Sequence, residues 1–261
     1  MVMLPREHGA YSQMALPLLT ALVIVHPAQP AVVIAIAVLC GFLAHEPLVV
    51  LLGGRGPRVR RADGSRAAIW FAMSATAMVA AGAAGVRLMP AAARWSILVP
   101  LIPAVWVGTS LLAKREKRAS AQIAVALAFA FAAVPMCLAA GFSVATAIAV
   151  GAVFGSVYVT GVLCVRTIVL AKRAGGRPKA SRATRRLLVA VAACSMVAFV
   201  IAANRAALPW TTLLAVAPGV GIALALAMRP SPPPLKTVGW SLASTSASAA
   251  LVLVSIAGQL S

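Results

Sequence analysis

Two short polar stretches near the N-terminus hold the residues best suited to chemistry. Glu7 and His8 immediately precede the first apolar run. His45 and Glu46 lie inside the second apolar run, directly before Pro47. Carboxylates and imidazoles can bind a divalent cation or transfer a proton. Because ionisable side chains are costly within apolar segments, those that occur there are candidates for a functional site.

Three arginines form a second set of candidates. Arg166 lies inside a later apolar run, and Arg60 and Arg61 belong to the Arg- and Gly-rich stretch of residues 53–66. Guanidinium groups bind phosphate through paired hydrogen bonds, and the backbone amides of a glycine-rich loop can add further donors. We therefore expect these arginines to contact an anion or a diphosphate.

The elements that must position these side chains are membrane helices. Of the 261 residues, 62% are hydrophobic and only 10% are charged, whereas soluble domains carry about 25% charged residues. Nine stretches have or approach the ~20 apolar residues that a helix needs to cross a bilayer. We predict one all-α membrane domain, residues 1–261, with spans at about 8–26, 30–52, 67–86, 93–113, 120–140, 143–171, 184–203, 207–228 and 237–258.

The formal net charge of +19 would indicate nucleic-acid binding in a soluble protein. Here the basic residues follow the topology instead. If the N-terminus is cytoplasmic, the outer connections hold only Arg87, Arg94 and Arg205, as the positive-inside rule requires. We therefore predict a multi-pass protein of the cytoplasmic (inner) membrane, with its C-terminus outside and no nucleic-acid partner. This alternation also requires that the first apolar segment is not removed as a signal peptide.

The expected positions of the candidate site residues along their helices place them all on the cytoplasmic side of the membrane. At 1.5 Å per residue, Glu46 lies ~10 Å and Arg166 ~9 Å from the cytoplasmic ends of their helices. Glu7 and His8 begin the first helix from that side. Pro47 cannot donate a helix hydrogen bond, so a kink is expected there. We predict that these residues converge on a polar cavity that opens to the cytoplasmic leaflet.

Small residues predict where helices pack closely. Gly151 and Gly155 form a GxxxG pattern, and residues 80–85 are all Ala or Gly. Such positions let the backbones of neighbouring membrane helices approach each other.

Three interpretations of the polar residues stay open. In the first, each is structural: Arg166 extends to the headgroups, Glu46 pairs with a basic neighbour, and Glu7 favours a helix N-terminus. In the second, His8, His45, Glu46 and also Glu7 surround a divalent cation, although neighbours on a helix point ~100° apart. In the third, Arg166 and the Arg- and Gly-rich loop hold an anionic headgroup or diphosphate, while Glu46 or His45 handles a proton or ion.

The N-terminal motif resembles a known family. The run Pro5-Arg6-Glu7-His8-Gly9-Ala10-Tyr11 is similar to the N-terminal signature of the YwiC-like family of bacterial integral membrane proteins. Residues 45–48 and the basic loop 114–118 fit the same family. The resemblance implies an integral membrane protein and names no reaction.

A weaker resemblance is to the UbiA-type prenyltransferases, which also have nine helices and a cytoplasmic N-terminus. His45 and Glu46 stand where the first acidic motif of those enzymes begins, and residues 60–64 are similar to the loop after it. Arg166 and Thr167 stand at the second acidic motif, where no acid is present. Paired aspartates hold Mg²⁺ against a diphosphate, so ordinary two-cluster Mg²⁺ chemistry is not expected here.

The UbiA resemblance implies a UbiA-like bundle and a divergent prenyltransferase-like activity on an isoprenoid-like or other anionic lipid. Glu46 and His45 would be the catalytic residues, Arg166, Arg60 and Arg61 would contact the anion, and a divalent cation would be the cofactor. Two other functions stay open, a small-solute or proton-coupled transporter and a non-catalytic subunit of a membrane complex.

Overall fold

The computed structural model describes residues 8–115, 118–173 and 179–260, and in these ranges it contains helices and no strand. The elements are α1 (His8–Ile24), α2 (Gln29–Leu51), α3 (Pro57–Leu88), the 3-10 helix η1 (Ala91–Ile97), α4 (Leu98–Leu112), α5 (Ala119–Phe131), α6 (Ala133–Ala139), α7 (Val144–Arg173), α8 (Lys179–Asn204), α9 (Thr212–Ala227), α10 (Leu235–Ser255) and α11 (Ala257–Leu260).

Within the described ranges, seven helical segments are long and apolar enough to cross a membrane, with η1–α4 and α5–α6 each counted as one segment. Two further apolar helices, Gly9–Ile24 and Thr212–Ala227, are shorter. Each of the nine apolar stretches recognised in the sequence overlaps one of these helices. The chain is therefore an all-helical, multi-pass membrane protein.

The third helix is longer than its apolar stretch, and most of the predicted loop 53–66 is wrong. α3 begins at Pro57, a residue favoured in the first helical turn because it has no N–H to satisfy there. Its 32 residues span ~48 Å, more than the ~30 Å hydrocarbon core. Only a tight turn remains between α2 and α3, and Gly53 and Gly56 supply its positive φ angles of 78° and 93°.

α2 continues past its proline. The helix runs without interruption from Gln29 to Leu51, and Pro47 is buried within it. The missing hydrogen bond at Pro47 therefore does not end the helix, and a further turn carries the chain to the α2–α3 connection.

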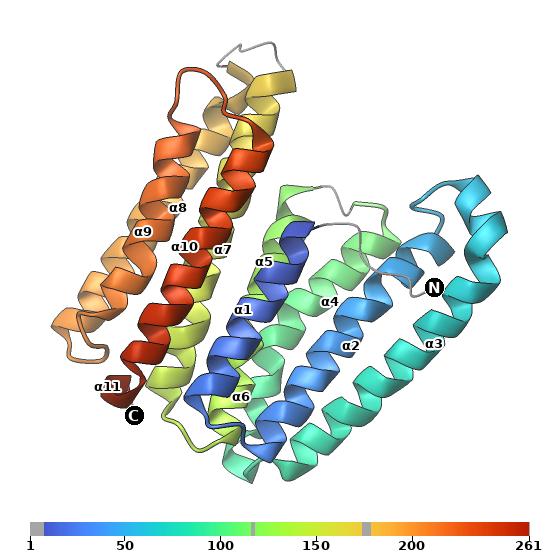
Figure 1. Ribbon diagram of the computed structural model, residues 1–261, viewed down its shortest axis with the longest axis horizontal. Helices are drawn as coiled ribbons and strands as arrows, with labels where there is room; N and C mark the ends of the chain where they lie inside the picture. Colours follow the sequence, from blue (N-terminus) through green and yellow to red (C-terminus); the bar gives the residue numbers. More distant parts are fainter. Residues whose placement is uncertain (1–7, 116–117, 174–178, 261) are drawn as a thin grey trace.

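α7 is the centre of the bundle and the most buried of the seven candidate spans. It packs against α5 and α6 on one side and against α8, α9 and α10 on the other (Figure 1). α1 lies between α10 and the pair α2 and α5, while α3 packs along α2 at the edge of the molecule. α4 packs along α5.

The helices alternate in direction, so alternate connections meet at the same end. Figure 1 shows the described connections 52–56 and 228–234 at the end where α1 begins, and 25–28 and 140–143 at the opposite end. We call the first of these the basic end, because it carries Arg55, Arg58, Arg60, Arg61, Arg66, Lys114, Arg115, Arg118, Lys172, Arg173, Arg182, Arg185, Arg186, Arg229 and Lys236.

Candidate functional site

A two-bond ion pair joins α2 to the turn that follows it. The Nε of Arg55 donates to Oε1 of Glu46 at 2.8 Å, and Nη2 donates to Oε2 at 2.6 Å. The Glu46 side chain is 5% exposed and the Arg55 side chain is 29% exposed. A bidentate, charge-assisted pair of this kind is the strongest geometry that an arginine and a carboxylate can form.

The backbone turn explains why Arg55 reaches Glu46. After α2 ends, the amides of Gly53 and Gly54 donate to the carbonyls of Val50 and Val49. These bonds fold the chain back over the last turn of α2, as glycine C-caps commonly do. The guanidinium of Arg55 is thereby placed against the helix one turn below its end.

The ion pair supports the first of the three interpretations of Glu46, in which its role is structural. Both carboxylate oxygens accept hydrogen bonds from Arg55, so the structure contains the pairing with a basic neighbour that the first interpretation expects. A buried carboxylate is tolerated when it is paired in this way. Glu46 could therefore bind a cation or take up a proton only if Arg55 moved away.

The glycines of the turn do not form the anion cradle expected from the sequence. The amides of Gly53 and Gly54 are used within the helix cap, and the amide of Gly56 donates to the carbonyl of Gly53. A cradle for an anion needs backbone amides that point outward without partners. These three amides already have partners within the chain.

The three arginines predicted to share an anion lie on separate parts of the fold. Arg60 and Arg61 are exposed in the first turns of α3, whereas Arg166 is half-buried on α7. In Figure 1, α3 and α7 lie on opposite sides of α1 and α2. This arrangement does not support one anion held by all three side chains.

Aromatic side chains link helices α1, α2 and α5 in a group that we call the aromatic cluster: Tyr11, Phe42 and Phe129. The rings of Tyr11 and Phe42 meet edge to face at 5.1 Å, and those of Phe42 and Phe129 at 5.8 Å. The hydroxyl of Tyr158 donates to the carbonyl of Ser12 at 3.4 Å. Tyr11 and Ser12 of α1 therefore contact α2 and α7 respectively, and α6 also packs against both of these helices.

The residues predicted to bind a metal are only partly described. Glu7 lies outside the described residues, as does the side chain of His8, although His8 begins α1. His45 is half-buried on α2. Within the described ranges, no three side chains of His, Cys, Asp or Glu gather closely enough to hold a metal ion. A site that includes Glu7 and His8 stays a prediction.

A shallow groove of about 460 Å³ lies between α1 and α10. We call it the α1–α10 groove, and it is lined by Tyr11, Ser12, Ala15, Leu16, Trp240, Ala243, Ser244 and Ala247. Sequence reasoning missed it because its residues come from the two ends of the chain. The available signal was the spacing of Trp240 and the small residues after it, which places them on one face of a helix.

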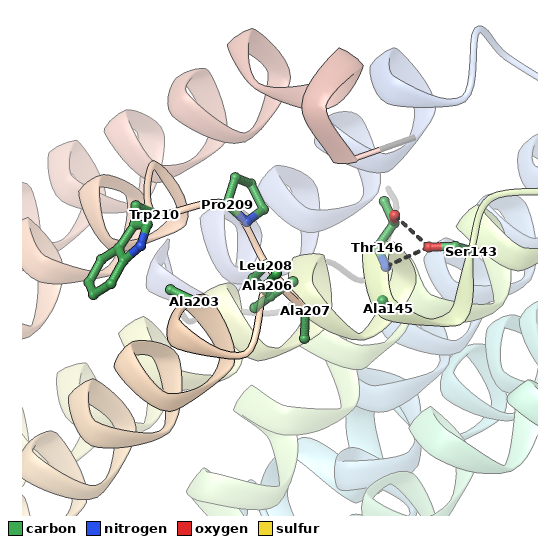
Figure 2. A pocket seen from close by; sticks show the side chains of 9 residues that line it. All are labelled: Ser143, Ala145, Thr146, Ala203, Ala206, Ala207, Leu208, Pro209 and Trp210. Atoms are coloured by element: carbon green, nitrogen blue, oxygen red, sulfur yellow. Dashed lines mark hydrogen bonds between the residues drawn. The ribbon is translucent and has the colours of Figure 1, made fainter.

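A second hollow, of about 500 Å³, lies at the end of the bundle opposite to the basic end. It is formed between the α6–α7 and α8–α9 connections (Figure 2). Its main polar groups are Ser143 and Thr146, whose hydroxyls are 2.8 Å apart. The Ser143 hydroxyl also accepts the backbone N–H of Thr146 at 3.1 Å, which caps the start of α7. Neither hollow includes Glu46, His45, Arg60, Arg61 or Arg166.

Comparison with known protein families matches residues 4–137 to a family described as YwiC-like protein. The matched part contains Glu46, Arg55 and the aromatic residues Tyr11, Phe42 and Phe129. No curated protein and no solved structure matches the chain.

Proposed function

The chain belongs to the YwiC-like family, and from this premise we propose that it is a cytoplasmic-membrane protein that binds an anionic or isoprenoid-like lipid, or a lipid diphosphate, at its basic end. The binding site would open to the cytoplasmic leaflet. Glu46 and Arg166 belong to helices that end there, and Arg55 lies in the turn at the same end.

The proposed orientation has nine membrane crossings, with the N-terminus inside and the C-terminus outside. The seven long candidate spans are joined by Gly9–Ile24 and Thr212–Ala227, which rise ~24 Å and need thinning of the bilayer or flanking residues to complete a crossing. The positive-inside rule then assigns the basic end to the cytoplasm.

The observation that carries the proposal is the excess of cations over acids at the basic end. The acidic residues of the described ranges are Glu46 and Asp63. Glu46 is already neutralised by Arg55. Because the whole sequence holds only four acids against 23 arginines and lysines, most cations of the basic end draw compensating charge from outside the chain, and anionic headgroups of the cytoplasmic leaflet supply it.

Arg166 is the arginine best placed to contact a bound headgroup. It is half-buried on α7, within the last third of that helix. Partly desolvated guanidinium groups interact more strongly with phosphate than fully exposed ones. Arg60 and Arg61 are exposed on α3 and would contact lipid phosphates at a separate edge of the molecule.

We predict that the protein is a divergent UbiA-like transferase. The positions of the sequence motifs alone support this activity. An anion that reached Arg55 would compete with Glu46 for the guanidinium. Glu46 or the neighbouring His45 could then act on a proton or a divalent cation, the roles assigned to them from the sequence. Any metal would be held by the carboxylate of Glu46 and the imidazole of His45, together with Glu7 and His8 of the N-terminal stretch.

Binding can be measured on the purified full-length protein by native mass spectrometry and by thermal unfolding. We expect retention of phosphatidylglycerol over phosphatidylcholine, and a higher Tm with a prenyl diphosphate. Arg166→Gln should weaken both effects, whereas Arg205→Gln, at the opposite end, should leave them unchanged. Equal retention of the two lipids, with no shift in Tm, would refute the proposed function.

A second candidate, proton-coupled transport, is favoured by one observation, the buried carboxylate of Glu46 on α2, which pairs with Arg55 in the following turn. Ionisable groups within spans commonly mark proton or ion pathways. Reconstituted protein would then show a proton flux that Glu46→Gln abolishes. A flux equal to that of empty vesicles would exclude this candidate and leave lipid binding unaffected.

A further inference from the structure

The geometry points to the α1–α10 groove as the site of one hydrocarbon chain of an anionic lipid, with the headgroup at Lys236. This inference rests on the proposed function, because it takes the basic end as cytoplasmic. It adds a defined location for the lipid, in a groove between α1 and α10 that is lined by none of the predicted site residues.

One face of α10 carries a lysine, a tryptophan and small residues in the order that would suit a lipid with a charged headgroup and an apolar chain. Lys236, Trp240, Ser244 and Ala247 are spaced by four, four and three residues, so they form a single stripe along the helix. Lys236 and Trp240 are exposed, Trp240 to 68%. The opposite face is the one that packs into the bundle, and it carries the buried residues Val238, Thr245, Ala249 and Leu253.

The length of the stripe matches one leaflet. From Lys236 to Ala247 the helix rises ~16 Å at 1.5 Å per residue. The hydrocarbon core of a bilayer is ~30 Å thick, so each leaflet contributes about half of it. A chain that lies in the groove with its headgroup at Lys236 would therefore end near the middle of the membrane.

The lining of the groove suits a hydrocarbon chain rather than a polar ligand. Carbon atoms make up almost all of its exposed surface, and its volume of about 460 Å³ falls in the ~300–1,000 Å³ range of small-molecule sites. The small side chains of Ala15, Ala243 and Ala247 leave this space open. On the α1 side, the ring of Tyr11 is held in place by its edge-to-face contact with Phe42.

Charge selects an anionic headgroup. Residues 228–236, which connect α9 to α10 and begin α10, contain Arg229 and Lys236 and no acid. Trp240 lies one turn further into the membrane, the level at which tryptophan rings prefer to sit beside headgroups. A cation near an anionic lipid surface contributes about 1 kcal/mol, which corresponds to a roughly fivefold preference for an anionic lipid over a zwitterionic one.

Trp240 is itself the reporter for a test. A variant that keeps Trp240, with Trp70, Trp95, Trp106 and Trp210 replaced by phenylalanine, is placed in nanodiscs with lipids brominated on their acyl chains. We expect brominated phosphatidylglycerol to quench Trp240 at about one-fifth of the mole fraction that brominated phosphatidylcholine requires. Lys236→Gln should remove this difference, whereas Arg205→Gln should retain it. A variant that keeps only Trp210 should show no preference.

Filling the groove gives an independent readout. Ala243→Phe should reduce quenching of Trp240 by the anionic lipid, while native mass spectrometry reports lipid retention by the whole protein. Equal quenching by both lipids would indicate ordinary contact with bulk lipid, and absence of quenching would indicate that protein, such as a second copy, covers the groove. Either result, with phosphatidylglycerol still retained, overturns the groove assignment alone. Loss of retention in the unmodified protein overturns the proposed function as well.

Discussion

Arg55 and Glu46 form an ion pair across the end of α2, with both oxygens of the carboxylate bonded to the guanidinium. The two partners differ in exposure, since Glu46 is almost fully buried and Arg55 reaches solvent. The pair closes the α2–α3 hairpin and neutralises a carboxylate within a predicted membrane span. Its two members should therefore respond differently to substitution.

Arg55→Ala should destabilise the protein more than Glu46→Gln. Removal of Arg55 leaves a buried, unpaired carboxylate, and breaking a buried pair in this way costs about 3 kcal/mol. Glu46→Gln removes the buried charge and leaves an arginine that can turn toward solvent. Unfolding midpoints of the purified protein in detergent would measure both effects.

The double variant Arg55→Ala with Glu46→Gln completes the comparison, because it removes the stranded charge. It should be more stable than Arg55→Ala alone, which a double-mutant cycle detects as coupling between the two sites. Additive losses would mean that the pair contributes nothing beyond its separate side chains.

Two glycines recognised as packing positions should behave in opposite ways. A Cβ at Gly151 would lie 2.7 Å from Cδ1 of Phe131 and 2.9 Å from Cγ2 of Val134, whereas a Cβ at Gly82 would meet no atom within 4 Å. Gly151→Ala should cost about 1–3 kcal/mol through overpacking. Gly82→Ala should be neutral or slightly stabilising, because alanine is the better helix former. Equal melting temperatures for the two variants would contradict the packing of α7 on α5 and α6.

Apolar length locates the helices of this chain because a bilayer demands a minimum apolar run. It fails at α3, whose polar turns beyond the membrane carry no apolar signal. Pro57 and the positive φ of Gly56 mark the true start of that helix. Likewise, Gly82 and Gly151 look alike in sequence, and only the position of the neighbouring helix separates a tight contact from an open one.

For the candidate site, the sequence predicts which residues need a partner but does not predict which residue the partner is. A buried carboxylate such as Glu46 needs a cation, but the choice of Arg55 depends on a turn set by two glycine conformations. The α1–α10 groove joins Tyr11 to Trp240 across almost the whole chain. Its small residues have no chemistry of their own, so only the packing of α1 beside α10 reveals it.

Cysteine labelling would test whether α9, one of the two short apolar helices, crosses the membrane. Ser231 and Ala207 are exposed in the connections on either side of it, and replacement of Cys40 and Cys194 by alanine leaves only the buried Cys137 and Cys164. In intact cells a membrane-impermeant maleimide should label Ala207→Cys and not Ser231→Cys. Permeabilised cells should show labelling at both positions. Equal labelling in intact cells would mean that α9 does not cross.

Tyr11 joins the N-terminal family motif to the helix of Glu46, through its edge-to-face contact with Phe42. Tyr11→Leu should lower stability, because such an aromatic pair contributes about 0.5–1.5 kcal/mol beyond its buried area. Tyr11→Phe keeps the ring and should retain most of that stability. A cycle with Phe42→Leu, read from unfolding midpoints, should show a coupling of the same size. If Tyr11→Phe were as damaging as Tyr11→Leu, the hydroxyl of Tyr11, and not its ring, would be what positions α1 against α2.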